Sequence, residues 1–248
     1  MQETRPAISL RKLVIMGATA SLRPPFRTIL LIELLITVVA ATIPSGATDA
    51  SAIIGGLVLV VVSALLQIAI MLAAANSEPG SKADPWIIAA LRKRCFWRFA
   101  LTRLLITLMV VLGVALVLLI GAELSLLWLT LLGVVVASAW GYVLGSVVGV
   151  AEQAAVLERR WPFNAMGRSA ELTRSSRRTV GVLFVLTVVA PNFLAGRFLG
   201  LDFLKSLGPF RLVPALVAIL VSTAGLIALT RAYVSLGGGQ VVTRRSHP

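Results

Sequence analysis

Six long apolar runs divide this chain, and they constrain its fold more than any other feature. Each run approaches the roughly 20 residues that an α-helix needs to cross a bilayer. With 58% hydrophobic residues, a chain of 248 residues exceeds what one soluble core buries, so lipid must solvate much of the surface. The runs occupy residues 28–43, 52–75, 104–120, 127–150, 179–196 and 212–230. The sequence therefore predicts an all-α membrane protein, a six-transmembrane-helix bundle.

The positive charge of the chain lies in alternate gaps between these runs. Of the 23 Lys and Arg residues, five precede the first run, six separate the second from the third, six separate the fourth from the fifth, and three follow the sixth. The opposite side carries only Arg197, Lys205 and Arg211. Because basic residues resist translocation, the pattern predicts that both termini and the two long loops are cytoplasmic.

This charge pattern also sets the domain organisation. We expect a basic cytoplasmic leader at residues 1–27, a six-helix transmembrane domain at 28–236 and a flexible cytoplasmic tail at 237–248. The first run is predicted to be an uncleaved span, because Glu33 interrupts it and Pro24 precedes it. The net charge of +13 flanks apolar spans, where headgroup attraction accounts for it, so no nucleic-acid partner is expected.

Residues suited to catalysis are scarce in the sequence. The single histidine, His247, lies beside the C-terminus, and the single cysteine, Cys95, cannot form an intramolecular disulfide. Metal-binding and nucleophile–base motifs are absent from the sequence. We therefore expect no enzyme activity, no cofactor and no metal site.

Glu33 is the one acidic residue well inside an apolar run. A carboxylate at that depth must pair or reach water, and Arg231 and Arg103 lie at a comparable depth on the cytoplasmic side. We expect an intramembrane ion pair between Glu33 and Arg231, with Arg103 as the other candidate partner. A proton or substrate role is the alternative, in which Glu33, Gln67 and Asn192 line a polar path through the bundle.

A stripe of small residues marks the fourth run at four-residue spacing. Small residues let helices approach closely in lipid, where van der Waals packing replaces the hydrophobic effect. The stripe predicts a helix at the crowded centre of the bundle, with homodimerisation as the alternative. It consists of Gly133, Ala137, Gly141, Gly145 and Gly149.

The segment 158–182 contains an amphipathic helix between the fourth and fifth runs. One predicted face carries Phe163, Met166, Ala170 and Thr173, and the other carries Arg168, Glu171, Arg174 and Arg178. Such a helix is expected to lie in the headgroup plane with its apolar face down. We predict lipid headgroup contacts for Arg168, Arg174 and Arg178. The preceding cytoplasmic loop, which begins near Pro85, predicts a second interfacial helix.

The order of residues in this segment resembles a known family. The matching residues are Leu157, Glu158, Ala165, Arg168, Ser169, Leu172, Thr173 and Arg174, together with Tyr233 in the last run. They resemble the membrane domain associated with glycerophosphoryl diester phosphodiesterases, which also occurs as a stand-alone bacterial membrane protein. A tryptophan that usually follows the Arg-Ser pair is Ala170 here. The phosphodiesterase barrel has no counterpart in these residues, so the resemblance implies a membrane module and not the hydrolase.

These features predict a non-enzymatic, multi-pass module of the bacterial cytoplasmic membrane. It is expected to contact anionic lipid, or a partner protein, through its basic cytoplasmic loops. The alternative is a small transporter or permease subunit that uses the polar path described above. Composition and spacing leave the oligomeric state open.

Overall fold

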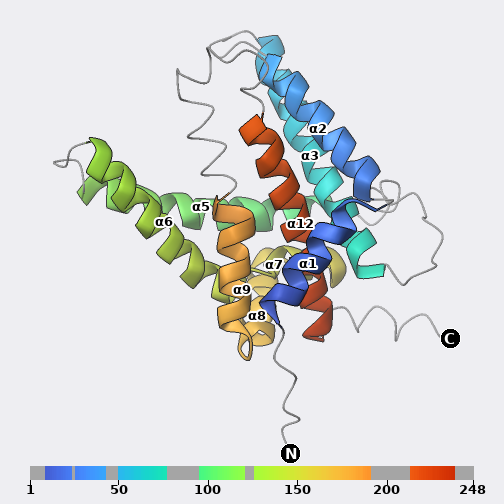
Figure 1. Ribbon diagram of the computed structural model, residues 1–248, viewed down its shortest axis with the longest axis vertical. Coiled ribbons are helices and arrows are strands. Elements are labelled where there is room, and N and C mark those ends of the chain that lie inside the picture. The colour runs from blue at the N-terminus through green and yellow to red at the C-terminus, as the bar shows by residue number, and fades with distance from the viewer. Residues whose placement is uncertain are drawn as a thin grey trace, which may run out of the picture.

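The apolar runs become helices in the computed structural model, which describes residues 9–23, 26–42, 50–76, 95–120, 126–190 and 213–237. Within these ranges all regular structure is helical and no strand occurs, which confirms the all-α class. The elements are α1 (Leu10–Ser21), α2 (Phe26–Thr42), α3 (Ala50–Asn76), α5 (Phe96–Ile120), α6 (Leu126–Val148), α7 (Ala151–Leu157), α8 (Pro162–Thr173), α9 (Arg177–Phe184), the π-helical turn η1 (Val185–Val189) and α12 (Val213–Ser235) (Figure 1).

Each predicted span coincides with a helix, although the boundaries shift by several residues. Three helical stretches among the described residues are long and apolar enough to cross a membrane, namely Val58–Ala75, Ser138–Leu157 and Leu216–Ser235. This finding supports a membrane protein, whereas the count of six spans stays a prediction. The predicted interfacial helix near Pro85 and the tail from residue 238 lie outside the described residues.

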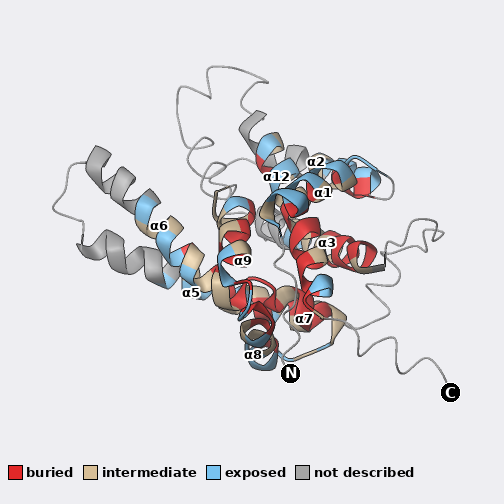
Figure 2. Cartoon of the chain, turned by 60° about the horizontal axis from the view of Figure 1, so that its bottom comes forward, coloured by how far each residue is buried: buried red, intermediate tan, exposed pale blue. Residues whose placement is uncertain are grey.

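Large apolar side chains on the outer surface show how this fold differs from a water-soluble one. On α5 they form a continuous exposed stripe of Trp97, Leu101, Leu104, Leu108 and Leu112. Their spacing of three or four residues keeps them on one side of the helix. Exposed apolar area of this extent marks a surface that contacts lipid or protein. Figure 2 shows buried residues concentrated on α3 and α7.

The last helix, α12, holds the bundle together. It packs against α1, α2, α3, α9 and η1, and Figure 1 shows α7 and α8 gathered at its lower end. Close approach depends on small residues: a Cβ at Gly17 of α1 would collide with the backbone of Ala224, and one at Gly225 would collide with Thr187 of η1. The positions of α1, α3 and η1 therefore depend on the position of α12.

The small residues of α6 pack against the fifth span of the same chain. A Cβ at Gly141 would lie 2.5 Å from Val189 Cγ2, and one at Gly145 would lie 2.5 Å from the Cβ of Phe184. A Cβ at Gly149 would lie 3.0 Å from Val180 Cγ1. The structure thus places this part of the stripe in an intramolecular contact with α9 and η1. The surroundings of Gly133 and Ala137 are outside the described residues.

Replacing Gly145 by leucine tests this contact. The added side chain has to displace Phe184, so we expect Gly145→Leu to lower the free energy of unfolding by about 1–3 kcal/mol. The matched control is Val143→Leu, because Val143 is half exposed on the opposite side of the same helix. The measurement is thermal unfolding of the detergent-solubilised protein. Equal melting temperatures for the two variants would show that the stripe does not pack closely.

Candidate functional site

The connection between α6 and α9 forms a compact polar site at one end of the bundle. After α6 the chain turns into α7 and then reverses direction at residues 158–161. Arg159 adopts a left-handed backbone conformation with φ of 55° in this reversal. Pro162 then begins α8, where its restricted φ suits the first helical position. The turn places Glu158 beneath the end of α12.

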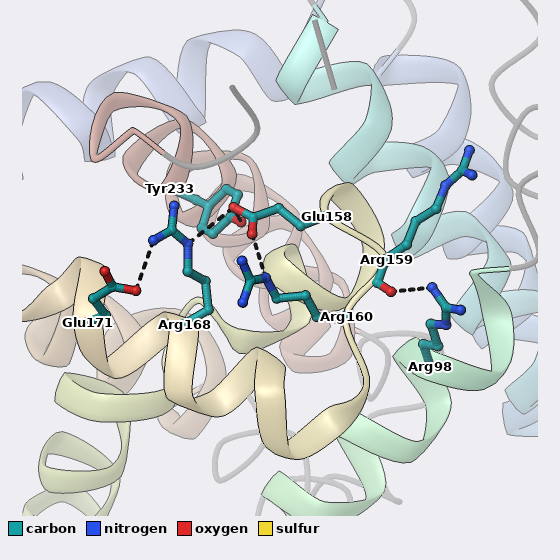
Figure 3. A network of polar contacts seen from close by, with 7 residues as sticks. All are labelled: Arg98, Glu158, Arg159, Arg160, Arg168, Glu171 and Tyr233. Carbon is teal, nitrogen blue, oxygen red and sulfur yellow. Dashed lines mark hydrogen bonds and ion pairs between the residues drawn. The ribbon is translucent and has the colours of Figure 1, made fainter. Parts of the chain in front are cut away.

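The centre of the site is the carboxylate of Glu158, whose side chain is only 2% exposed. It accepts hydrogen bonds from Arg160 Nε at 2.7 Å and Arg168 Nε at 3.4 Å. The hydroxyl of Tyr233, on α12, donates a third (Figure 3). A buried charge is tolerated only when it is paired and hydrogen-bonded, and this carboxylate is both.

Arg168 connects this carboxylate to a second one. Its Nη1 lies 2.9 Å from the carboxylate of Glu171, one turn further along α8. Burial opposes the charge of Arg168, but the hydrogen bonds and charges of Glu171 and Glu158 outweigh it and raise the pKa of Arg168 above its ordinary value. The guanidinium therefore stays charged in a network that joins α8 to α12 through Glu158.

Two hydroxyls on α8 satisfy backbone groups where α6 ends. Ser169 Oγ accepts a hydrogen bond from the Val150 N–H at 3.3 Å. The Thr173 hydroxyl donates within 2.9 Å of the carbonyls of Ser146 and Ser169. A helix end that is buried needs such partners for its unpaired N–H and C=O groups. Both side chains are fully buried, so α8 packs against α6 through polar contacts.

This contact shows which face of α8 packs on the bundle. Phe163, which was expected on the lipid-facing side with Met166 and Ala170, is 77% exposed, and the predicted contact of that side with the headgroup layer stays a prediction. The buried residues are instead Pro162, Ala165, Ser169, Leu172 and Thr173. Small side chains let α8 approach the bundle, and the hydroxyls find backbone partners there. The buried face of α8 therefore packs on protein.

The site brings together the residues that carry the family resemblance. Glu158, Arg168, Ser169, Thr173 and Tyr233 contact one another or the end of α6. Ala165 and Leu172 belong to the same buried apolar cluster as Tyr233, and Leu157 packs at its edge. The sequence did not predict that Glu158 pairs with Tyr233. The one available signal concerned Glu158 itself, an acidic residue that directly follows an apolar run and precedes two arginines, and it gave no indication of the partner.

The arginines predicted to contact headgroups fall into two groups. Arg168 has a side chain only 19% exposed, and it forms ion pairs with the carboxylates of Glu158 and Glu171. Arg174 is exposed on the turn after α8, and Arg178 is exposed in the first turn of α9. The headgroup prediction therefore stays with Arg174 and Arg178.

A second polar group lies within the bundle around Glu33. Thr223 of α12 donates a hydrogen bond to the Glu33 carboxylate at 3.2 Å, and the side chain of Gln67 on α3 also bonds to it. Arg103 is close enough for its charge to act on Glu33. The ion pair between Glu33 and Arg231 stays a prediction, and Asn192 lies outside the described residues.

Comparison with known proteins adds no assignment. No protein-family model matches this chain, and neither does any curated protein or solved structure. Among the residues that the structure describes, no group of three or more His, Cys, Asp or Glu side chains is placed to hold a metal ion. The role of the site is therefore inferred from the geometry of its residues.

The hydrogen bond from Tyr233 to Glu158 can be tested by removing one hydroxyl. Tyr233→Phe leaves the buried carboxylate with one donor fewer, so we expect the free energy of unfolding to fall by about 1.5–3 kcal/mol. The chain has one other tyrosine, Tyr142, whose hydroxyl makes no hydrogen bond within the described ranges. Tyr142→Phe is thus the matched control in a thermal unfolding assay. A Tyr233→Phe variant as stable as the control would exclude a stabilising role for this bond.

Proposed function

We propose that this protein is a non-enzymatic module of the bacterial cytoplasmic membrane, with six spans and both termini in the cytoplasm, which contacts anionic lipid. The alternation of apolar runs and basic gaps supports this topology. The resemblance to the membrane domain associated with glycerophosphoryl diester phosphodiesterases supports a role as a membrane module and not as a hydrolase. The non-enzymatic role rests on the sequence, whose only histidine is His247.

One observation supports the lipid contact most directly. Arg174, on the turn after α8, and Arg177 and Arg178, in the first turn of α9, are exposed, and none forms an ion pair with a residue that the structure describes. The carboxylates of Glu158 and Glu171 pair with Arg160 and Arg168 instead. Unpaired cations beside an apolar helix attract anionic headgroups. A partner protein with an acidic surface is the competing occupant of this turn.

A transporter is the second candidate, and the group around Glu33 favours it. Three helices, α2, α3 and α12, contribute Glu33, Gln67 and Thr223 to one hydrogen-bonded group. The buried Oε1 of Gln67 has no hydrogen-bond partner among the residues that the structure describes. Polar side chains that converge inside a bundle are typical of ion or substrate paths. Transport would further require that water or substrate reaches this group.

The lipid contact predicts a stability that depends on headgroup charge. In nanodiscs, wild-type protein should melt at a higher temperature in phosphatidylglycerol than in phosphatidylcholine, since each exposed arginine near an anionic surface contributes about 1 kcal/mol. Arg174→Gln combined with Arg178→Gln should reduce this difference, and so should high salt. The matched control, Arg174→Lys with Arg178→Lys, keeps the charge and should keep the difference. Identical melting in both lipids for the wild type would contradict the proposal.

A further inference from the structure

The exposed apolar stripe of α5 locates the cytoplasmic edge of the lipid-facing surface. It begins at Trp97, whose side chain is 72% exposed, and continues through Leu101, Leu104, Leu108 and Leu112. Tryptophan is enriched where a membrane protein meets the headgroup layer. Residues next to Trp97 are therefore expected at the depth of lipid phosphates.

Arg98 follows Trp97 and links α5 to the reversal between α7 and α8. Its Nη1 donates a hydrogen bond to the backbone carbonyl of Arg159, and its guanidinium lies 5.5 Å from the centre of the Trp161 ring. Stacking on an aromatic ring orients a guanidinium while leaving donors available. Figure 3 shows the guanidinium groups of Arg98 and Arg159 on the same side of the view, apart from the Glu158 network.

The charges of these two arginines are not compensated within the described residues. The ion pairs of this region join Arg160 and Arg168 to Glu158 and Glu171. Arg98 and Arg159 form none of them, although the hydrogen bond keeps the two residues adjacent. Arg159 contributes only its carbonyl to this contact, so its exposed side chain is available to a ligand.

We propose that Arg98, Arg159 and Trp161 form a binding site for the phosphate of an anionic phospholipid in the cytoplasmic leaflet. The proposal rests on the membrane role proposed above, but it names a site separate from the turn at Arg174. Guanidinium groups bind phosphate oxygens through paired, charge-assisted hydrogen bonds. The exposed indoles of Trp97 and Trp161 border the site and suit the glycerol region of a lipid. Because the apolar stripe of α5 begins beside the site, we expect the ligand to be a lipid and not a free phosphate.

The test measures phosphatidylglycerol bound to the intact chain in mild detergent by native mass spectrometry. Arg98→Gln combined with Arg159→Gln should weaken binding at least about tenfold, which corresponds to about 1.4 kcal/mol. The matched control, Arg11→Gln with Lys12→Gln, removes the same charge from exposed positions of α1 and should bind like the wild type. Arg159→Gln alone keeps the carbonyl contact, so it should fold normally and still bind measurably more weakly.

Each failure has a distinct meaning. If the Arg98 and Arg159 variant binds phosphatidylglycerol as tightly as the control, the site is wrong, while the lipid contact at Arg174 and Arg178 stands. If wild-type protein binds phosphatidylglycerol no better than phosphatidylcholine, both proposals are wrong. If millimolar inorganic phosphate displaces the bound lipid, the ligand is free phosphate and the lipid assignment is overturned.

Discussion

The arrangement of α7, α8 and the end of α12 depends on one interaction, the pairing of the buried carboxylate of Glu158. A charge that is withdrawn from water must be surrounded by donors, and here the donors come from three parts of the chain: the reversal itself, α8 and the end of α12. Moving either arginine would leave the buried carboxylate with less compensating charge, and moving Tyr233 would leave it with one hydrogen bond fewer. Helix α12 and the α7–α8 connection are therefore positioned by one group, although Tyr233 lies 75 residues from Glu158.

This arrangement divides the arginines around the site by role. Arg160 and Arg168 pair with the buried carboxylate of Glu158, and Arg168 also pairs with the exposed carboxylate of Glu171. Because those carboxylates are already paired, no described carboxylate neutralises Arg98, Arg159 or the exposed arginines that follow α8. Their charges can attract an external anion. In this strongly basic chain, Glu158 and Glu171 thus pair with arginines of the site itself. The proposed lipid contacts follow from that division, because only unpaired cations attract headgroups.

Apolar periodicity and length predicted where the helices lie, and small-residue spacing predicted a close contact for Gly141 and Gly145. The face of α8 that packs on protein could not be predicted, because its pattern distinguishes an apolar face from a polar one but not lipid from protein. Ser169 was placed on neither face, yet it is buried because its hydroxyl accepts a hydrogen bond from the Val150 N–H at the end of α6. The partner of Glu158 could not be found either, since a contact between Glu158 and Tyr233 leaves no periodic signal. The charge pattern predicted a headgroup role for Arg168 but could not show which arginines are paired.

Amide hydrogen exchange of the Glu158→Gln variant tests the central role of this carboxylate most directly. Glutamine keeps the size of the side chain but removes the charge that holds Arg160 and Arg168. We predict faster exchange throughout α8 and in the last turn of α12, because both lose their common partner. The core of α3 at Ile68–Leu72, which packs in a separate apolar cluster, should exchange as in the wild type. Unchanged protection of α8 in this variant would contradict the account, since α8 would then be held by its apolar and hydroxyl contacts alone.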